Sequence, residues 1–196
     1  MLIAEEGSPK AAQRALTFVA DPLDGTTNFL HGFPWYAVSI AALKDGAQVA
    51  GAVLNAANGE LFTAAAGGGA RRNGQAIGVS KITDPSRALL GTGFPFKQRE
   101  GIAPYMKVMP RIMEQTAGLR RAGSAALDLC DVACGRYEAF WEYQLAPWDV
   151  AAGILIIREA GGVVTDFDGN PAPVAKGPIV AGNPKMHAWL LEQLRS

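Results

Sequence analysis

Short apolar runs separated by glycine-containing turns make up the first half of this 196-residue chain, and this pattern limits its fold most strongly. Lys44-Asp45-Gly46, Asn58-Gly59 and Asn73-Gly74 are turn sequences. An Asp-Gly or Asn-Gly pair between apolar runs favours a tight β-hairpin, because both residues accept a positive φ. We therefore predict an antiparallel meander, with strands at residues 16–20, 37–43, 49–54, 61–66 and 76–79.

The second half alternates helical and strand-like segments. Residues 149–160 are apolar on most faces, which predicts a buried helix that ends at Gly161-Gly162. Ser124 is placed to cap one helix, and Asn183-Pro184 begins the last one. Other helices are expected at 103–115 and 124–133, and strands at 119–122, 137–141, 163–165 and 179–181.

Sheets interleaved with helices imply a layered α+β architecture. We expect residues 1–92 to form one half around the antiparallel sheet, and residues 93–196 to form an α/β half. Residues 93–100 resemble the connection between them, and the cleft should lie between the two sheets. The two halves should form one compact unit.

Composition excludes several classes of protein. Eighteen basic residues balance eighteen acidic ones, so charge gives no reason to expect nucleic acid or an anionic membrane as a partner. No apolar run approaches the roughly 20 residues that span a bilayer, and the N-terminus lacks the pattern of a signal peptide. Cys130 and Cys134 have no matching zinc ligands nearby, which favours reduced thiols in a cytoplasmic protein.

The segment 21–29, DPLDGTTNF, carries the strongest chemical signal. Asp21 and Asp24 flank a turn led by Pro22, and they follow an apolar strand. Both carboxylates and the Leu23 carbonyl can then converge on one point, and oxygen ligands of this kind suit Mg²⁺. Gly25 permits an unusual backbone angle, after which exposed N–H groups can bind an anion. Alone, Asp-x-x-Asp-Gly would be an ordinary acidic turn.

Further carboxylates lie elsewhere in the chain. Glu5-Glu6 is by itself a solvated acidic patch, whereas Asp149 begins the apolar helix predicted at 149–160. A carboxylate there can simply cap the helix, but a helix this apolar should place it in a cleft. Glu142 follows the strand at 137–141.

Taken together, these segments resemble the inositol monophosphatase family of magnesium-dependent, lithium-sensitive phosphatases. The resemblance covers essentially the whole chain, and its second and fourth stretches are together highly specific. The four matching stretches are Glu5-Glu6-Gly7, residues 21–35, residues 120–126, and residues 148–162. The resemblance implies a layered αβαβα sandwich, with residues 1–92 as the metal-binding half.

The resemblance also implies the metal ligands. Glu5 and the Leu23 carbonyl would bind the first of two or three Mg²⁺ ions, and Asp21 would bridge two ions. Asp24 and Asp149 would hold the second. Glu5, Asp24 and Thr26 would be the catalytic residues, and Thr26 with Glu5 would position the attacking water.

The substrate-binding residues follow from the same resemblance. The backbone of Gly25 and Thr26 would bind the phosphate. The pocket for the alcohol would be lined by Gly123, Ser124, Ala125 and Glu142. The expected partner is thus a small phosphorylated substrate, with neither nucleic acid nor membrane, and the resemblance implies a homodimer.

Several substrates fit this pattern. myo-Inositol 1-phosphate comes first, while fructose 1,6-bisphosphate, histidinol phosphate and nucleotide 2′- or 3′-phosphates are alternatives. A non-catalytic, metal-binding regulatory domain is the alternative from another class.

The resemblance implies that members of this family carry a further N-terminal segment, which consists of packed helices and a mobile hairpin. This chain starts at Met1, four residues before Glu5. We therefore expect an N-terminally truncated version of the sandwich, in which Glu5 is weakly held and an upstream extension would raise stability and activity.

Overall fold

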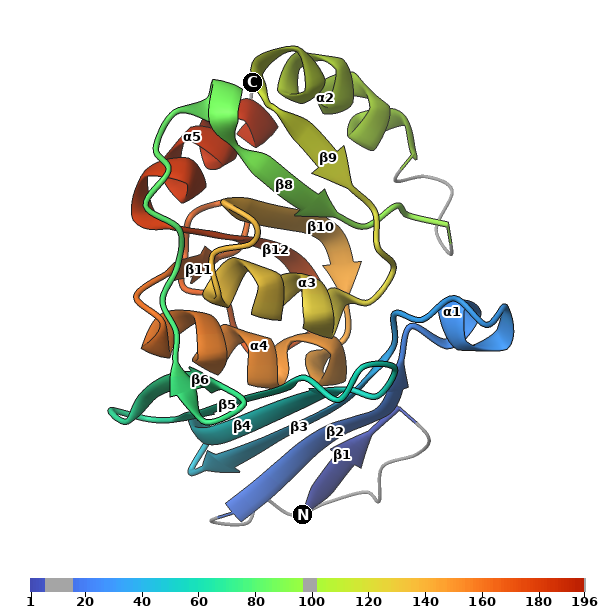
Figure 1. Ribbon diagram of the computed structural model, residues 1–196, viewed down its shortest axis with the longest axis vertical. Coiled ribbons are helices and arrows are strands. Elements are labelled where there is room, and N and C mark those ends of the chain that lie inside the picture. The colour runs from blue at the N-terminus through green and yellow to red at the C-terminus, as the bar shows by residue number, and fades with distance from the viewer. Residues whose placement is uncertain (6–15, 97–101, 196) are drawn as a thin grey trace.

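The structure, a computed structural model, describes residues 1–5, 16–96 and 102–195. The described residues form two β-sheets interleaved with helices, stacked in layers (Figure 1). A seven-stranded sheet lies at one end of the stack and a five-stranded sheet lies above it. This layering confirms the predicted α+β fold class.

Four of the five α-helices in the described residues provide the helical layers. Helices α3 (Ala125–Ala133) and α4 (Pro147–Glu159) pack between the two sheets. Helices α2 (Ile102–Gln115) and α5 (Pro184–Arg195) cover the far face of the five-stranded sheet (Figure 1). The described residues therefore form four layers in the order sheet, helices, sheet, helices.

The seven-stranded sheet follows the chain in order from β1 to β7. β1 pairs in parallel with β2, and every later neighbour pairs antiparallel. This confirms the predicted meander. The strands are β1 (Leu2–Ala4), β2 (Leu16–Asp24), β3 (Ala37–Lys44), β4 (Ala47–Asn55), β5 (Leu61–Ala65), β6 (Gly69–Arg72) and β7 (Gln75–Ala76).

Two hairpins of this sheet confirm the turn prediction in detail. Asp45 and Gly46 join β3 to β4 with φ values of 51° and 83°. Asn73 and Gly74 join β6 to β7 with φ values of 50° and 80°. Positive φ at both central residues is the type I′ geometry that matches the twist of paired strands. These two pairs therefore fix the register of their hairpins.

The five-stranded sheet has the strand order β11-β12-β10-β8-β9. β8 lies parallel to both β10 and β9, while β12 pairs antiparallel with β10 and β11, so the sheet is mixed. Its strands are β8 (Leu89–Thr92), β9 (Gly118–Arg120), β10 (Ala139–Leu145), β11 (Val163–Thr165) and β12 (Gly177–Gly182). Two short helices complete the fold, namely α1 (Thr26–Leu30) and the 3₁₀-helix η1 (Pro85–Arg87).

Close helix packing holds the layer between the sheets. A Cβ on Gly153 of α4 would lie 2.6 Å from Leu129 Cδ1 of α3. A Cβ on Gly51 of β4 would lie 3.2 Å from the Cα of Ala152. The small residues of α4 therefore let it approach both α3 and the seven-stranded sheet, and its middle is buried as predicted.

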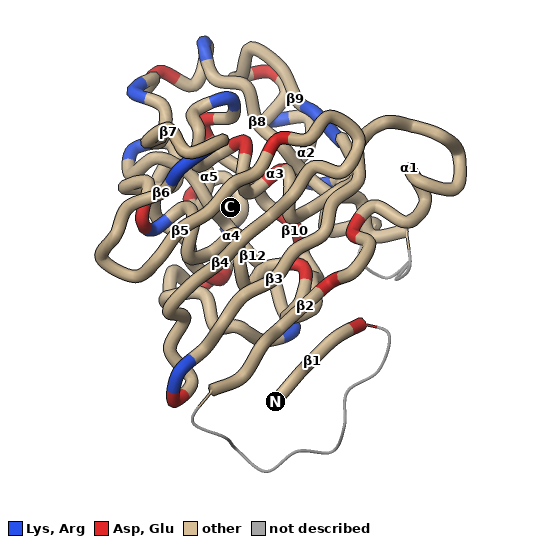
Figure 2. Tube along the Cα trace, turned by 60° about the horizontal axis from the view of Figure 1, so that its bottom comes forward, with Lys and Arg blue, Asp and Glu red and all other residues tan. Residues whose placement is uncertain are grey.

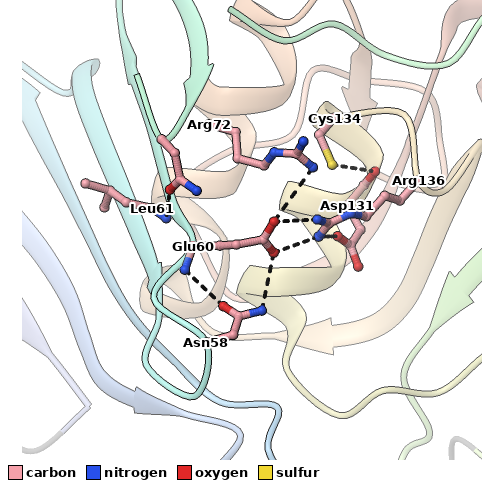
Figure 3. Close-up of polar contacts among 8 residues, drawn as sticks. Asn58, Glu60, Leu61, Arg72, Asp131, Cys134 and Arg136 are labelled. Atoms are coloured by element: carbon pink, nitrogen blue, oxygen red, sulfur yellow. Dashed lines mark hydrogen bonds and ion pairs between the residues drawn. The ribbon is translucent and has the colours of Figure 1, made fainter. Parts of the chain in front are cut away.

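An ion-pair network joins the first sheet to the end of α3 (Figure 3). The Arg136 guanidinium donates to both oxygens of Glu60, at 2.9 and 2.5 Å, and to Asp131 Oδ1 at 2.9 Å. Arg72 approaches Glu60 at 3.7 Å, and the Cys134 thiol contacts the Asp131 carbonyl. Asp131 is buried, so Arg136 compensates a carboxylate that has lost its water.

Several predicted elements need correction. β2 does not end at residue 20 but continues to Asp24, because a bulge keeps the acidic motif paired with β3. β6 was not predicted, since Gly69–Arg72 has no apolar run. The strand expected at 137–141 lies at Ala139–Leu145.

The boundaries of the two halves stay predictions. β8 (Leu89–Thr92) lies within the half predicted at residues 1–92, but it pairs with β10 in the five-stranded sheet. The predicted connection at 93–100 lies partly outside the described residues. Glu6 and Gly7 of the first matching stretch also lie outside them.

One face of the seven-stranded sheet exposes apolar side chains. Leu16 and Phe18 of β2 and Ile40 of β3 are 45%, 42% and 43% exposed. The opposite face buries Val19 and Ala41 against the helices, as expected for alternating strand residues. None of the helices described is long and apolar enough to cross a bilayer.

Candidate metal centre

A β-bulge in β2 creates the acidic site. Asp21 pairs with Ser39 and Asp24 pairs with Ala37, so residues 22 and 23 oppose a single residue of β3. Residues three apart in a regular strand point to opposite faces. The extra residue of the bulge therefore returns the Asp24 side chain to the same face as that of Asp21.

Gly25 ends this strand and begins α1. Its φ is 83°, and a Cβ there would lie 3.0 Å from the Trp35 carbonyl and 3.3 Å from the Gly123 carbonyl. Both the left-handed backbone and the close approach thus require glycine. The Thr26 hydroxyl donates to the Leu23 carbonyl at 3.0 Å, and this bond closes the turn.

Hydrogen bonds from Asn28 link the loop after β2 to the segment that precedes α3. Its amide donates to the Trp35 carbonyl at 2.7 Å and to the Ala122 carbonyl at 2.9 Å. Ala122 directly precedes the Gly123 carbonyl that packs on Gly25. The motif in the first half and the start of α3 therefore form one rigid corner.

The start of α3 positions Asp24. Ser124, which is fully buried, caps the helix by accepting from the Leu127 N–H at 3.4 Å, as predicted. Its hydroxyl also donates to Asp24 Oδ2 at 2.5 Å, and the Ala126 N–H donates to the same oxygen at 2.8 Å. Asp24 is therefore held by one donor side chain and by the N-terminus of a helix, which favours a carboxylate.

Asp149 enters from the first turn of α4. Pro147 occupies the first position of the helix, where its missing N–H does no harm. The Ala146 N–H donates to Asp149 Oδ2 at 2.7 Å. The carboxylate thus both caps the helix and reaches the cavity, so the two alternative interpretations of this residue are compatible.

Three carboxylates converge from these elements. Oxygen atoms of Asp21, Asp24 and Asp149 all lie within 4.8 Å of one another. Glu5 lines the same cavity but stands outside this close trio. Figure 2 shows acidic positions at the ends of β1 and β2, the two strands that lead into the site. Two ligand atoms that each lie about 2.1 Å from one ion are at most about 4.2 Å apart. The carboxylate oxygens can therefore bind Mg²⁺ if they move slightly closer together, or if they bind two neighbouring ions.

Burial and repulsion from neighbouring carboxylates make Asp21 and Asp24 reluctant to ionise. Desolvation, with further repulsion from Asp24, raises the pKa of Asp21 from 3.8 to about 7, although the Leu23 N–H opposes this. Desolvation also raises the pKa of Asp24 above its ordinary value, against the donors Ser124 and Ala126. A site that assembles carboxylates at this electrostatic cost is typical of a binding site for cations.

A cavity of about 410 Å³ surrounds the carboxylates. Glu142 of β10 projects into it, and burial with repulsion from Asp149 raises the pKa of Glu142 to about 8. A Cβ on Gly93 would lie 2.0 Å from Glu142 Oε2, so the side chain packs directly on that glycine. The absence of a side chain at Gly93 therefore leaves the space that the Glu142 carboxyl occupies.

The structure brings every predicted site residue to this cavity. Those lining it are Glu5, Asp21, Leu23, Asp24, Gly25, Thr26, Gly123, Ser124, Ala125, Glu142 and Asp149. Sequence reasoning missed Asp128, a buried carboxyl of α3 with one unpartnered oxygen among the described residues. Desolvation, with repulsion from Asp131 and Asp24, raises its pKa well above the ordinary value. The available signal was a carboxylate in the first turn of a predicted helix, four residues after its cap Ser124.

Other lining residues were also missed. Phe94, Phe96, Arg121, Tyr143 and Lys176 face the cavity, and none of them stands out in the sequence by type or spacing. They come from separate loops and strands, so only the folded chain brings them together.

The fold and the trio place this chain in a class of layered α/β proteins that carry an acidic, metal-compatible centre in a cavity. The model of the inositol monophosphatase family matches residues 1–196. The chain belongs to the inositol monophosphatase family, which supports phosphatase activity.

Relatives and solved structures agree with this assignment. The chain is 48% identical over 192 residues to "Nus factor SuhB" of Pseudomonas aeruginosa, covering 97% of this chain and 70% of that protein. It is 45% identical over 194 residues to "Inositol-1-monophosphatase" of Rhizobium meliloti, covering 98% and 73%. The crystal structure of extragenic suppressor protein suhB from Bartonella henselae matches with a TM-score of 0.95 and 43% identity, over 100% of this chain and 75% of that one.

Proposed function

We propose that this protein hydrolyses a small phosphomonoester with magnesium, and that myo-inositol 1-phosphate is the first candidate substrate. The observation that carries the proposal is the trio of Asp21, Asp24 and Asp149 beside the start of α1. A carboxylate cluster beside the N–H groups at the start of a helix can hold a cation and a phosphate side by side. The name of the Rhizobium relative supports the choice of substrate.

The donor set fits magnesium. Its members are carboxylates together with the Leu23 carbonyl, and hard cations prefer such oxygen ligands. We assign Asp21, Asp24, Asp149 and Glu5, with the Leu23 carbonyl, as ligands of two or three ions. When bound, magnesium would lower the pKa of water and neutralise charge on the phosphate and the leaving oxygen.

The chain's own residues would orient the reactants. The backbone N–H groups of Gly25 and Thr26 stand at the start of α1, where an anion is favoured. The Thr26 hydroxyl already donates to Leu23, so its oxygen is free to accept from a water. We assign Thr26 and Glu5 to hold that water and Asp24 to the catalytic group.

The alcohol pocket would lie beyond the phosphate. Gly123 and Ala125 line the cavity, and Glu142 presents a carboxyl that can bind a hydroxyl group. Ser124 lines it as well, but its hydroxyl is committed to Asp24, so we assign it to holding that carboxylate. Fructose 1,6-bisphosphate, histidinol phosphate and nucleotide phosphates remain alternatives for this pocket.

Phosphate release from myo-inositol 1-phosphate tests the proposal. We expect activity in Mg²⁺, none in excess EDTA, and a loss of at least about 100-fold in Asp149→Asn, because a metal ligand is removed. Glu159→Gln, at the other end of the same helix, is the matched control and should keep full activity. Full activity in EDTA would refute the mechanism.

A second candidate function has one observation in its favour. The P. aeruginosa relative is named "Nus factor SuhB", which does not describe a phosphatase. A regulatory protein that binds metal without catalysis would bind Mg²⁺ to the trio yet release no phosphate from any monoester. The assay above, repeated with the alternative substrates, therefore separates the two functions.

Two further proposals concern assembly and location. The family supports a homodimer, and the free thiols of Cys130 and Cys134 support a cytoplasmic setting. Light scattering at micromolar concentration tests the first, and a stable monomer would remove it.

A further inference from the structure

Arg121 stands at the cavity without a role in the proposed chemistry. It lies in the loop between β9 and α3 and lines the cavity. A Cβ on Gly123 would lie 2.7 Å from Arg121 Nη1, so the guanidinium extends along that loop. Arg121 is exposed, and among the described residues no carboxylate lies within ion-pair distance of it.

Two aromatic rings fix the guanidinium. Its central carbon lies 4.9 Å from the centroid of Phe96 and 5.8 Å from that of Phe94. The rings contact each other edge to face, with centroids 5.7 Å apart. Cation–π contact leaves the N–H edge of arginine available, and that planar fork suits carboxylate and phosphate.

Lys176 adds a second positive charge to the same cavity. It precedes β12, is exposed, and has no ion-pair partner among the residues described. Asp128 and Glu142 also line the cavity and interact electrostatically with Arg121. If magnesium neutralises the metal-site carboxylates, these two cations offset the two remaining carboxyls, so that the exposed guanidinium of Arg121 can attract an anion.

The position of Arg121 relates it to the phosphate. The Gly123 carbonyl packs on Gly25, the residue assigned to hold the phosphate, and the guanidinium extends along the same glycine. One small molecule can therefore place a phosphate at Gly25 and a second anionic group at Arg121.

We propose that Arg121 forms a second anion subsite in the active-site cavity, to which Lys176 adds a further positive charge. A phosphomonoester that carries a further phosphate or carboxylate on the leaving alcohol would then be hydrolysed with a higher kcat/KM than an otherwise matched substrate without it. This inference rests on the proposed function and names a substrate class for the same site.

Matched substrates isolate the subsite. Glycerol 2-phosphate and 2-phosphoglycerate differ only in whether a hydroxymethyl or a carboxylate neighbours the ester. Propane-1,3-diol monophosphate and bisphosphate provide the same comparison for a second phosphate. For each pair, the ratio of kcat/KM in Mg²⁺ reports the contribution of the second anion.

Arg121→Gln should reduce that ratio by about 10- to 100-fold, because it removes a charged hydrogen bond. Arg121→Lys should give an intermediate ratio, since it keeps the charge but loses the fork. Arg120→Gln is the matched control, because Arg120 is the exposed neighbour that donates to the Leu119 carbonyl, and it should leave the ratio unchanged. The wild-type preference should also weaken as salt rises.

The outcomes are distinct. A ratio lowered in one pair only identifies whether the subsite takes carboxylate or phosphate. Hydrolysis of all four substrates with the ratio unchanged in Arg121→Gln would overturn the subsite and leave the proposed function intact. An equal loss on both members of a pair would place Arg121 at the transferred phosphate and also overturn it. No hydrolysis of any substrate would overturn both proposals.

Discussion

Replacing Asp21 with asparagine should stabilise the metal-free protein, even though it should abolish activity. Asp21 is 1% exposed, and its pKa is raised to about 7 from 3.8. That difference corresponds to up to about 4 kcal/mol against folding once the carboxyl ionises. Asparagine has the same shape, keeps an oxygen for the Leu23 N–H, and carries no charge.

The sign of the pH dependence follows from the direction of this shift. The folded state binds the Asp21 proton more tightly than the unfolded state, so its contribution is most favourable below pH 3.8. The contribution is lost as the pH rises from 3.8 to about 7. The gain in Asp21→Asn should therefore be small near pH 4 and largest at pH 8.

Urea unfolding in EDTA at pH 4, 6 and 8 measures this gain. Asp45→Asn is the control, because Asp45 lies in an exposed hairpin turn where asparagine also accepts a positive φ. Magnesium at 100 times its Kd should add about 2.7 kcal/mol to the wild type, and much less to the variant. An Asp21→Asn protein that is no more stable than wild type in EDTA at pH 8 would refute the reasoning.

Three other substitutions test contacts in the cavity, in the ion-pair network and in the helix layer between the sheets. Gly93→Ala should displace the Glu142 carboxyl, 2.0 Å from the new Cβ, and raise KM more than it lowers kcat, whereas Gly78→Ala, with its nearest atom at 3.6 Å, should not. Arg136→Gln should cost about 1–3 kcal/mol in urea unfolding, because it leaves Asp131 buried without its cation; Arg72→Gln should cost less than about 1 kcal/mol. Gly153→Ala should lower the unfolding free energy by about 1–3 kcal/mol through its clash with Leu129, while Gly177→Ala, with no atom within 4 Å, should change it little. Equal effects in any pair would contradict the corresponding contact.

The sequence predicted those parts of the fold that local chemistry determines. Asp45-Gly46 and Asn73-Gly74 define their own turns, and Ser124 caps its own helix. The bulge in β2 was not predictable in this way, because it depends on pairing with β3. For the same reason β2 was predicted too short, although its motif was recognised.

The candidate site shows the same division. Asp21, Asp24 and Asp149 were found because carboxylates at strand and helix ends have a recognisable setting. Asp128 and Arg121 were not assigned, since their significance depends on neighbours from distant segments. Phe96 makes a cation–π contact with Arg121, while Asp24 and Asp131 repel Asp128 electrostatically. Only the fold brings these groups together.

Anomalous diffraction from crystals soaked in Mn²⁺ tests the shared metal centre most directly. We expect an anomalous peak about 2.1 Å from oxygens of Asp21, Asp24 and Asp149, as for a hard divalent cation. The peak should disappear in Asp21→Asn at the same Mn²⁺ concentration. Peaks only elsewhere on the protein, or a peak in this cavity that survives the substitution, would contradict the assignment of the trio as the metal site.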